Sequence, residues 1–202
     1  IGKEILFKAN IGLIYDKLKR YDKAEEYLEW SVNEARKHKE EYALMTSLNQ
    51  LAIVLSAQKQ YADSEKANLE ALALAKKMNN LQYLGFCYLQ QAELKRIQKD
   101  VPAMKENLLN SIEVSTQLGY IGNICEAKTG LGLAYIYEKN FTQAQKFTLE
   151  SYNLALENKL DEYAKKAAFQ LLSISMATGN INEINKYNNL FDSIEQKINK
   201  QQ

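Results

Sequence analysis

Few side chains in this sequence are suited to acid–base, nucleophilic or metal chemistry. His38 is the only histidine, and it lies in the charged run RKHKEE near the expected end of a helix. There a histidine complements the helix dipole or is simply solvated. One histidine does not build a histidine-based metal cluster, and it leaves no second base for a cysteine or serine nucleophile. The sequence therefore predicts no catalytic residue, no metal site and no cofactor.

The two cysteines and the glycine-containing stretches fit structural roles better than chemical ones. Cys87 and Cys125 have neither metal nor redox spacing, and they fall in helices whose axes, about 8–10 Å apart, usually hold Cα atoms beyond bridging range. GLG at 130–132 and GYIG at 119–122 resemble phosphate loops, but no strand precedes either. Buried free thiols and helix-associated glycines are expected, and the protein is predicted not to be an enzyme.

Composition limits the classes of partner. The chain has 202 residues, with 26 basic and 25 acidic side chains, so no electrostatic footprint for nucleic acid is present. The longest apolar runs, such as LAIV at 51–54, are too short to span a bilayer, and no direct membrane contact by this segment is predicted. Because the chain begins with Ile1, we expect a fragment of a longer protein. The compartment stays open: the cytoplasm is favoured, and the periplasm fits if the parent is a membrane sensor.

The positions of small and large residues repeat every 40 residues. One proline and eight glycines in 202 residues favour long helices, and no strand-like alternation is evident. Stepping by 40 through the chain defines columns of equivalent positions, and the column of Gly12 continues with Ala52, Ala92, Gly132 and Leu172. A fixed period of 20 to 50 residues is the signature of a stacked array. The fold class expected is all-α, with units of about 1–40, 41–80, 81–120, 121–160 and 161–200 in a single domain over 1–202.

Each unit reads as two helices, A and B. In the first unit, helix A is expected from Ile5 to Leu18 and helix B from Asp22 to Lys37. DKAE at 22–25 and TQAQ at 142–145 fit a capping box at the start of helix B, and Pro102 fits the first turn of the third helix B. The ends of helices B are expected near residues that tolerate the left-handed conformation: Asn79, Gly119 and Asn158.

The fifth unit departs from the small-residue columns. It has Leu172, Ile184 and Phe191 where other units carry mainly smaller residues. These large side chains indicate a terminal unit with different packing.

The stretch NIGLIYDKLKRYDKAEEYLEWSV resembles the tetratricopeptide repeat. The matching positions are Asn10, Ile11, Gly12, Tyr15, Tyr21, Asp22, Ala24 and Ser31. The period is six residues longer than the common 34, and the usual tryptophan early in helix A is absent. Repeats of this long kind occur in arrays of bacterial signalling regulators and in some eukaryotic adaptor proteins. The resemblance implies a right-handed α-solenoid of about five helix–turn–helix repeats whose concave side is lined by helices A.

One column of helix A carries side-chain amides in four of five units. An amide both donates and accepts hydrogen bonds, which suits the backbone of an extended peptide, although an amide there also serves as a bond between neighbouring helices. The residues predicted to line a ligand groove are Asn10, Asn49, Gln50, Gln90, Glu93, Arg96, Thr129, Tyr137 and Gln170.

Two classes of function follow from this interpretation. The first is a non-enzymatic module that binds a protein or an extended peptide in the concave groove, as the sensor or docking part of a bacterial signalling protein. The alternative is a structural scaffold or dimerisation array with no groove ligand, in which a homodimer forms through the C-terminal repeat.

Overall fold

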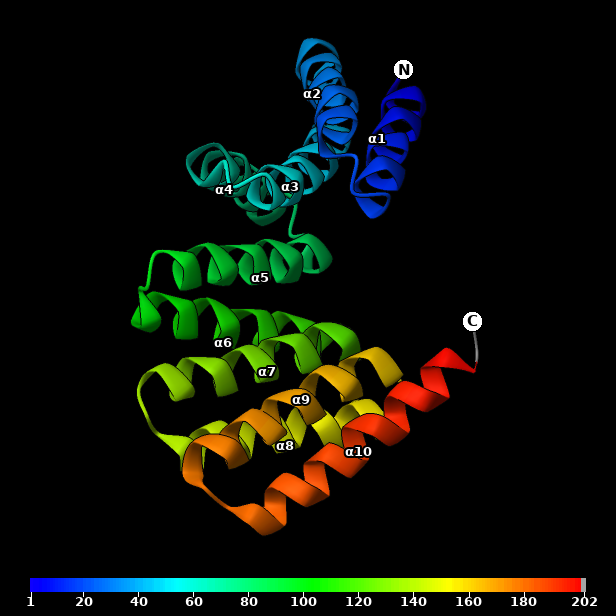
Figure 1. Cartoon of the computed structure of the whole chain (residues 1–202). Coiled ribbons are helices and arrows are strands. Elements are labelled where there is room, and N and C mark those ends of the chain that lie inside the picture. Colours follow the sequence, from blue (N-terminus) through cyan, green and yellow to red (C-terminus); the bar gives the residue numbers. More distant parts are fainter. Residues whose placement is uncertain (201–202) are drawn as a thin grey trace. The chain divides into compact units, whose positions relative to one another are not determined.

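Helices separated by short turns make up the computed structural model, which describes residues 1–200 (Figure 1). All regular structure in this range is helical, which confirms the predicted all-α fold of repeated helix–turn–helix units. The helices are α1 (Gly2–Lys17), α2 (Tyr21–His38), α3 (Glu41–Ala57), α4 (Tyr61–Lys77), α5 (Leu81–Ile97), α6 (Val101–Leu118), α7 (Ile121–Tyr137), α8 (Phe141–Glu157), α9 (Asp161–Thr178) and α10 (Ile181–Asn199).

The even-numbered helices begin at equivalent positions of the sequence. Their first residues are Tyr21, Tyr61, Val101, Phe141 and Ile181, so each begins 40 residues after the previous one. The large apolar column that starts at Tyr21 thus marks the first turn of every helix B.

The turns between helices share one backbone feature, a residue in the left-handed conformation. After each helix from α1 to α9, one residue adopts a positive φ of 49–72°, and these residues recur every 20 positions. They are Lys19, Lys39, Lys59, Asn79, Lys99, Gly119, Lys139, Lys159 and Gly179. Asn79 and Gly119 were predicted for this role, and the prediction is confirmed. Helix α8 also ends near Asn158 as predicted, but Asn158 is its C-cap with a φ of −101°, and the left-handed conformation falls on the next residue, Lys159.

The capping-box predictions for helix B starts are also wrong. The N-cap of α2 is Arg20, without a side-chain cap, and that of α8 is Asn140, whose side chain accepts from the Gln143 amide. The helices start earlier than expected, so Asp22 lies inside the first turn, where its carboxylate favours the positive end of the helix dipole. Pro102 lies in the first turn of α6, as predicted.

The chain divides into two compact units, Ile1–Gln98 with α1–α5 (unit 1) and Lys99–Gln202 with α6–α10 (unit 2). Within each unit every helix packs against the next one in the chain. Small residues permit this packing: Ala24 and Ala144 are fully buried, and the Ser31 hydroxyl reaches the Ile5 carbonyl oxygen at 3.3 Å. The expectation of one domain over 1–202 stays a prediction.

Candidate functional site

The side-chain amides of Gln90 and Gln170 form hydrogen bonds with other groups of the protein. Gln170 Nε2 on α9 donates to the Thr129 carbonyl oxygen at 3.0 Å and to Thr148 Oγ1 at 2.9 Å. Gln90 Nε2 on α5 lies 3.4 Å from both the Ala52 carbonyl oxygen and Ser64 Oγ. In both cases the amide ties a helix A to the carbonyl of the preceding helix A and to a hydroxyl of the preceding helix B.

Gln50, in the same column, lacks this arrangement. The positions in α2 that correspond to Ser64 and Thr148 are Ala24 and Leu28, which offer no hydroxyl. Within the described part of the chain, Gln50 Oε1 is buried and has no hydrogen-bond partner. Asn10, the first member of the column, is exposed on α1. A buried acceptor without a donor is costly, so Gln50 is suited to accept from a group outside these residues.

The other predicted groove residues lie in varied environments. Asn49 is buried with its Nδ2 3.6 Å from Cys87 Sγ, and Thr129 is buried with its hydroxyl 2.9 Å from that of Ser151. Their side chains serve helix packing.

Besides Asn10 and Gln50, three predicted residues are accessible at the surface. Glu93 and Arg96 on α5 form a two-point ion pair, with oxygen–nitrogen distances of 2.7 and 2.5 Å. Tyr137, at the end of α7, is 46% exposed. Unit 1 therefore holds the accessible predicted residues Asn10, Gln50, Glu93 and Arg96, whereas Tyr137 belongs to unit 2.

An aromatic cluster on α3 and α5 was missed by the sequence analysis. The rings of Tyr42 and Tyr83 meet edge to face at 6.1 Å, and those of Tyr83 and Phe86 at 5.9 Å. Tyr42 is 46% exposed, and Ile53 further along α3 is 40% exposed. Burial raises the pKa of the Tyr83 hydroxyl, which shares hydrogen bonds with Thr46 and Tyr42. Tyr42 and Tyr83 are 41 residues apart in sequence, so a comparison at steps of 40 does not pair them.

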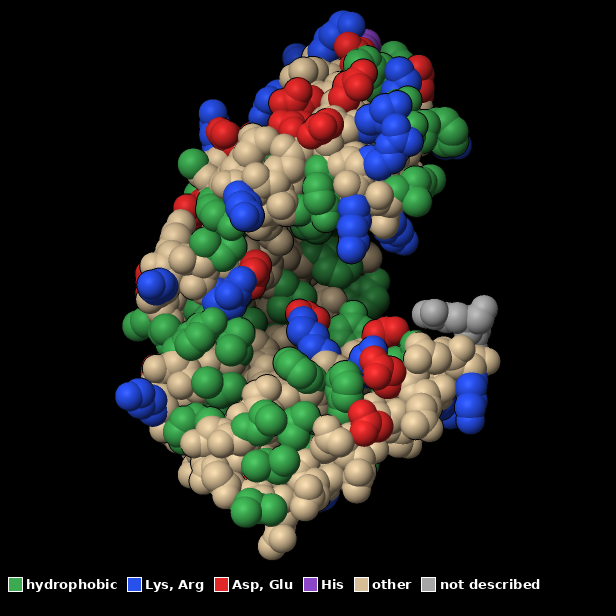
Figure 2. Space-filling model, in the orientation of Figure 1, with side chains coloured by type: hydrophobic (Ala, Val, Ile, Leu, Met, Phe, Trp, Pro, Cys, Tyr) green, Lys and Arg blue, Asp and Glu red, His purple; other side chains and the backbone are tan. Residues whose placement is uncertain are grey.

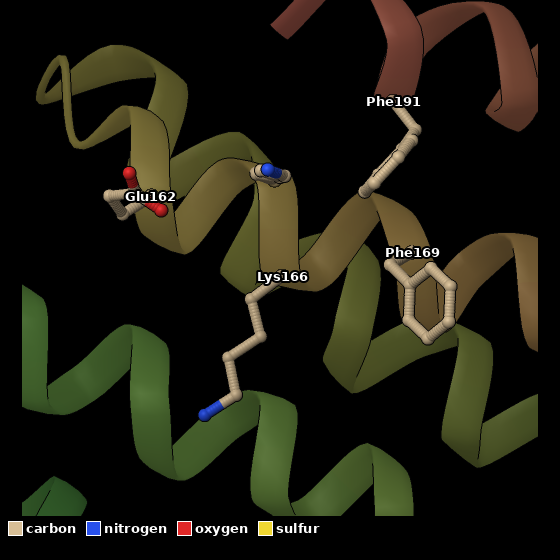
Figure 3. A pocket seen from close by; sticks show the side chains of 5 residues that line it. Glu162, Lys166, Phe169 and Phe191 are labelled. Atoms are coloured by element: carbon tan, nitrogen blue, oxygen red, sulfur yellow. The ribbon is translucent and has the colours of Figure 1, made fainter. Parts of the chain in front are cut away.

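A second accessible feature lies between α9 and α10 in unit 2. A hollow of about 290 Å³ is lined by Glu162, Lys165, Lys166, Phe169 and Phe191. Figure 3 shows Phe191 extending from α10 toward Phe169 on α9, and the ring centroids are 5.7 Å apart. The lysines have partners already: Lys165 pairs with Glu195 at 2.8 Å, and Lys166 reaches Glu126 on α7. The hollow therefore offers two aromatic rings, and its two lysines are already paired with carboxylates.

The two cysteine thiols are buried and are not suited to act as nucleophiles. Burial raises the pKa of the Cys87 thiol to about 12 and also raises that of Cys125, so neither is a thiolate at neutral pH. Both cysteines are buried and free, as predicted. Residues 1–200 contain no group of three metal-ligating side chains close enough to hold an ion.

The surface charge is mixed. On the face drawn in Figure 2, basic and acidic side chains are interspersed without a large patch of one sign. A search of the same described range finds no helix with the length and apolar character needed to cross a membrane.

Comparisons with known proteins agree with this architecture. Residues 5–77 match the tetratricopeptide repeat family model. No curated protein matches the chain. Among solved structures, BtubC (BKLC) from P. vanneervenii superposes with a TM-score of 0.82 at 12% identity, covering 98% of this chain and 82% of that one.

Two further solved structures share the fold at similarly low identity. A putative kinesin light chain of Podosopora anserina with nearly identical TPR-like repeats has a TM-score of 0.74 at 14% identity, with 98% of each chain covered. The apo form of RapI has a TM-score of 0.75 at 13% identity, covering 98% of this chain and 85% of that one. The family match covers residues 5–77, and the solved structures show that nearly the whole chain has the same fold of stacked helical repeats.

Proposed function

We propose that this protein is a non-enzymatic module that binds a polypeptide segment on helices α1, α3 and α5 of unit 1. Tetratricopeptide repeats are protein-interaction modules, which supports the general class. The finer proposal is that the bound segment is extended and that the module is the sensor or docking part of a signalling protein.

The observation that carries the proposal is the unpaired Oε1 of Gln50. In the equivalent positions of α5 and α9, the glutamine amide donates to groups of the protein itself, whereas the α2 positions that correspond to the two hydroxyls are Ala24 and Leu28, which have none. Gln50 as a residue is only partly buried, so a rotation of its amide would bring this oxygen to a peptide N–H group of the bound segment. Such a bond contributes about 0.5–1.5 kcal/mol, so further contacts must supply most of the affinity.

The aromatic cluster supplies the apolar part of such a site. The exposed edge of Tyr42, backed by Tyr83 and Phe86, is suited to pack against a large apolar side chain of the segment. Tyr42 lies two turns before Gln50 on the same helix. An extended chain crossing α3 would therefore place one apolar side chain and one backbone N–H within reach of these two groups.

The test compares two glutamines of the same column. Peptides selected by display against the intact chain serve as ligands, and their affinity is measured by calorimetric titration. Gln50→Ala and Tyr42→Ala should each weaken binding at least threefold, with little change in unfolding free energy. Gln170→Ala is the matched control: it should lower stability, because two internal hydrogen bonds are lost, and leave affinity unchanged. Equal affinity for all variants would contradict the proposed site.

Self-association through the fifth hairpin is the alternative function, and one observation favours it. Phe169 is 57% exposed and Met176 63% exposed, both on α9, and Phe169 borders the aromatic hollow. Isolated apolar side chains are ordinary, but two on one helix beside a hollow mark a candidate interface. Sedimentation velocity should then show a dimer that Phe169→Asp dissociates. A monomer at all accessible concentrations would exclude this alternative.

A further inference from the structure

The contact between α4 and α5 in unit 1 is apolar at one end and polar at the other. A turn at residues 78–80 joins the end of α4 to the start of α5. On both sides of this turn the buried side chains are apolar, namely Leu72, Ala75 and Leu84. At the opposite end, the start of α4 meets the end of α5 through a group of polar side chains, here called the polar seam: Glu65, Asn68, Gln91, Lys95 and Gln98.

Hydrogen bonds connect the members of the polar seam, but one acceptor is left over. Asn68 Nδ2 donates to the Cys87 carbonyl oxygen at 3.1 Å and to Gln91 Oε1 at 2.9 Å. The Glu65 carboxylate accepts bonds of 3.0, 2.7 and 2.9 Å from Gln91, Lys95 and Gln98. Asn68 Oδ1 is buried and has no hydrogen-bond partner among the residues that the structure describes. A buried acceptor without a donor weakens the contact in which it lies.

Two other contacts of the same kind are apolar at these positions. Helix α2 packs on α3, and α6 packs on α7, as α4 packs on α5. In those contacts the columns of Asn68 and Gln91 hold buried leucines: Leu28 and Leu51, Leu108 and Leu131. Separating leucines exposes apolar surface to water, whereas separated polar side chains exchange protein hydrogen bonds for bonds to water at a small net cost. We therefore expect the polar seam to open more readily than the leucine contacts.

The hydrogen bonds that tie α5 to α3 are long as well. Gln90 Nε2 lies 3.4 Å from the Ala52 carbonyl oxygen, and Asn49 Nδ2 lies 3.6 Å from Cys87 Sγ. The equivalent bond from Gln170 to the preceding helix A measures 3.0 Å. The amide of Gln90 thus holds its helix less tightly than that of Gln170.

The end of α5 that lies along the polar seam carries part of the predicted groove. Residues 91–97, here called the α5 arm, include the ion-paired Glu93 and Arg96. A pivot at the turn of residues 78–80 would move the α5 arm most, because the arm is the part of the helix farthest from that turn. We infer that the α5 arm opens at the polar seam and closes on a segment bound at Gln50 of α3; the closing step rests on the proposed function.

Hydrogen exchange of the ligand-free chain tests the opening. Amides of residues 91–97 should exchange roughly tenfold faster than those of residues 51–57, which are the equivalent half of α3. Both segments are the last turns of a helix A, so fraying of helix ends affects them alike. Equal exchange in the two segments overturns the inference. This measurement needs no ligand, so its result is independent of the proposed function.

Two variants of the seam move the exchange in opposite directions. Asn68→Leu combined with Gln91→Leu copies the leucine contacts and should bring the exchange of the α5 arm to within about threefold of residues 51–57. Glu65→Ala removes the acceptor of three hydrogen bonds and should speed the exchange of the arm further. Asn188→Leu is the matched control, since Asn188 shares the column of Asn68 but is exposed on α10, and it should change neither segment. An α5 arm whose exchange responds to neither seam variant contradicts the inference.

A bound peptide tests the closing. A display-selected peptide whose affinity depends on Gln50 should, at saturation, slow exchange of the α5 arm roughly tenfold. A peptide that binds at Gln50 and leaves exchange of the arm unchanged overturns the inference, while the proposed function stands.

Discussion

Replacing Gly132 by alanine tests the close contact between α7 and α8. A Cβ atom added at Gly132 would clash with Thr148 Oγ1 and with Gln170 Nε2, and it would lie 3.1 Å from the Ala144 carbonyl oxygen. The first two atoms belong to the hydrogen bond that ties α9 to the preceding hairpin. The third is backbone and cannot rotate away. The methyl group would therefore displace the Gln170 amide and push the two helices apart.

The expected cost combines three effects. The Gln170 amide makes two hydrogen bonds, of 3.0 and 2.9 Å, and losing them costs about 1 kcal/mol each. Overpacking between α7 and α8 costs about 1–3 kcal/mol. The higher helix propensity of alanine returns about 1 kcal/mol. The net loss is about 2–4 kcal/mol, which for a chain of this size lowers the melting temperature by roughly 4–16 °C.

Gly130→Ala provides the control two residues away on the same helix. Its added Cβ would meet the Leu108 side chain, with Cδ2 at 2.8 Å and Cδ1 at 3.1 Å. Those methyl groups can shift, so the gain in helix propensity should offset most of the cost. Urea unfolding followed by circular dichroism measures both variants. If Gly132→Ala is as stable as Gly130→Ala, the close-contact reasoning is refuted.

Three further predictions concern the turns, the ion pairs and the thiols. Lys139 has a φ of 58°, which L-residues adopt at a cost, so Lys139→Gly should raise the unfolding free energy by about 0.5 kcal/mol in urea titrations; a loss would contradict this. The hydrogen bond from Lys95 holds the pKa of Glu65 below its usual 4.5. The stabilisation by this ion pair is therefore complete above pH 4.5 and is lost as the pH falls through the folded-state pKa of Glu65. The difference in unfolding free energy between wild type and Glu65→Gln should shrink on acidification. A difference that stays constant with pH would refute the role of the pair. In a Cys125→Ala variant, Cys87 should react with a thiol reagent at pH 8 only as fast as the protein unfolds, since burial raises its pKa to about 12; rapid labelling of the folded protein would contradict this.

Local patterns in the sequence were sufficient to predict the helical hairpins. Apolar spacing, the rarity of proline and glycine, and the 40-residue columns indicated helices whose observed bounds lie within a few residues of those expected. The columns of small residues also predicted the helix packing correctly, because a small buried residue such as Ala24 lets two helices approach closely. The exact helix starts and the lysines in left-handed turns were missed, since lysine carries no local signal for that conformation.

The role of each groove residue was decided by tertiary structure. Gln50, Gln90 and Gln170 occupy one column, yet whether the amide is satisfied depends on a hydroxyl that a different helix does or does not supply. The local spacing of residues determines which face of a helix a side chain occupies. Its hydrogen-bond partner or packing neighbour comes from another helix, so only the tertiary structure determines which positions remain accessible to a partner.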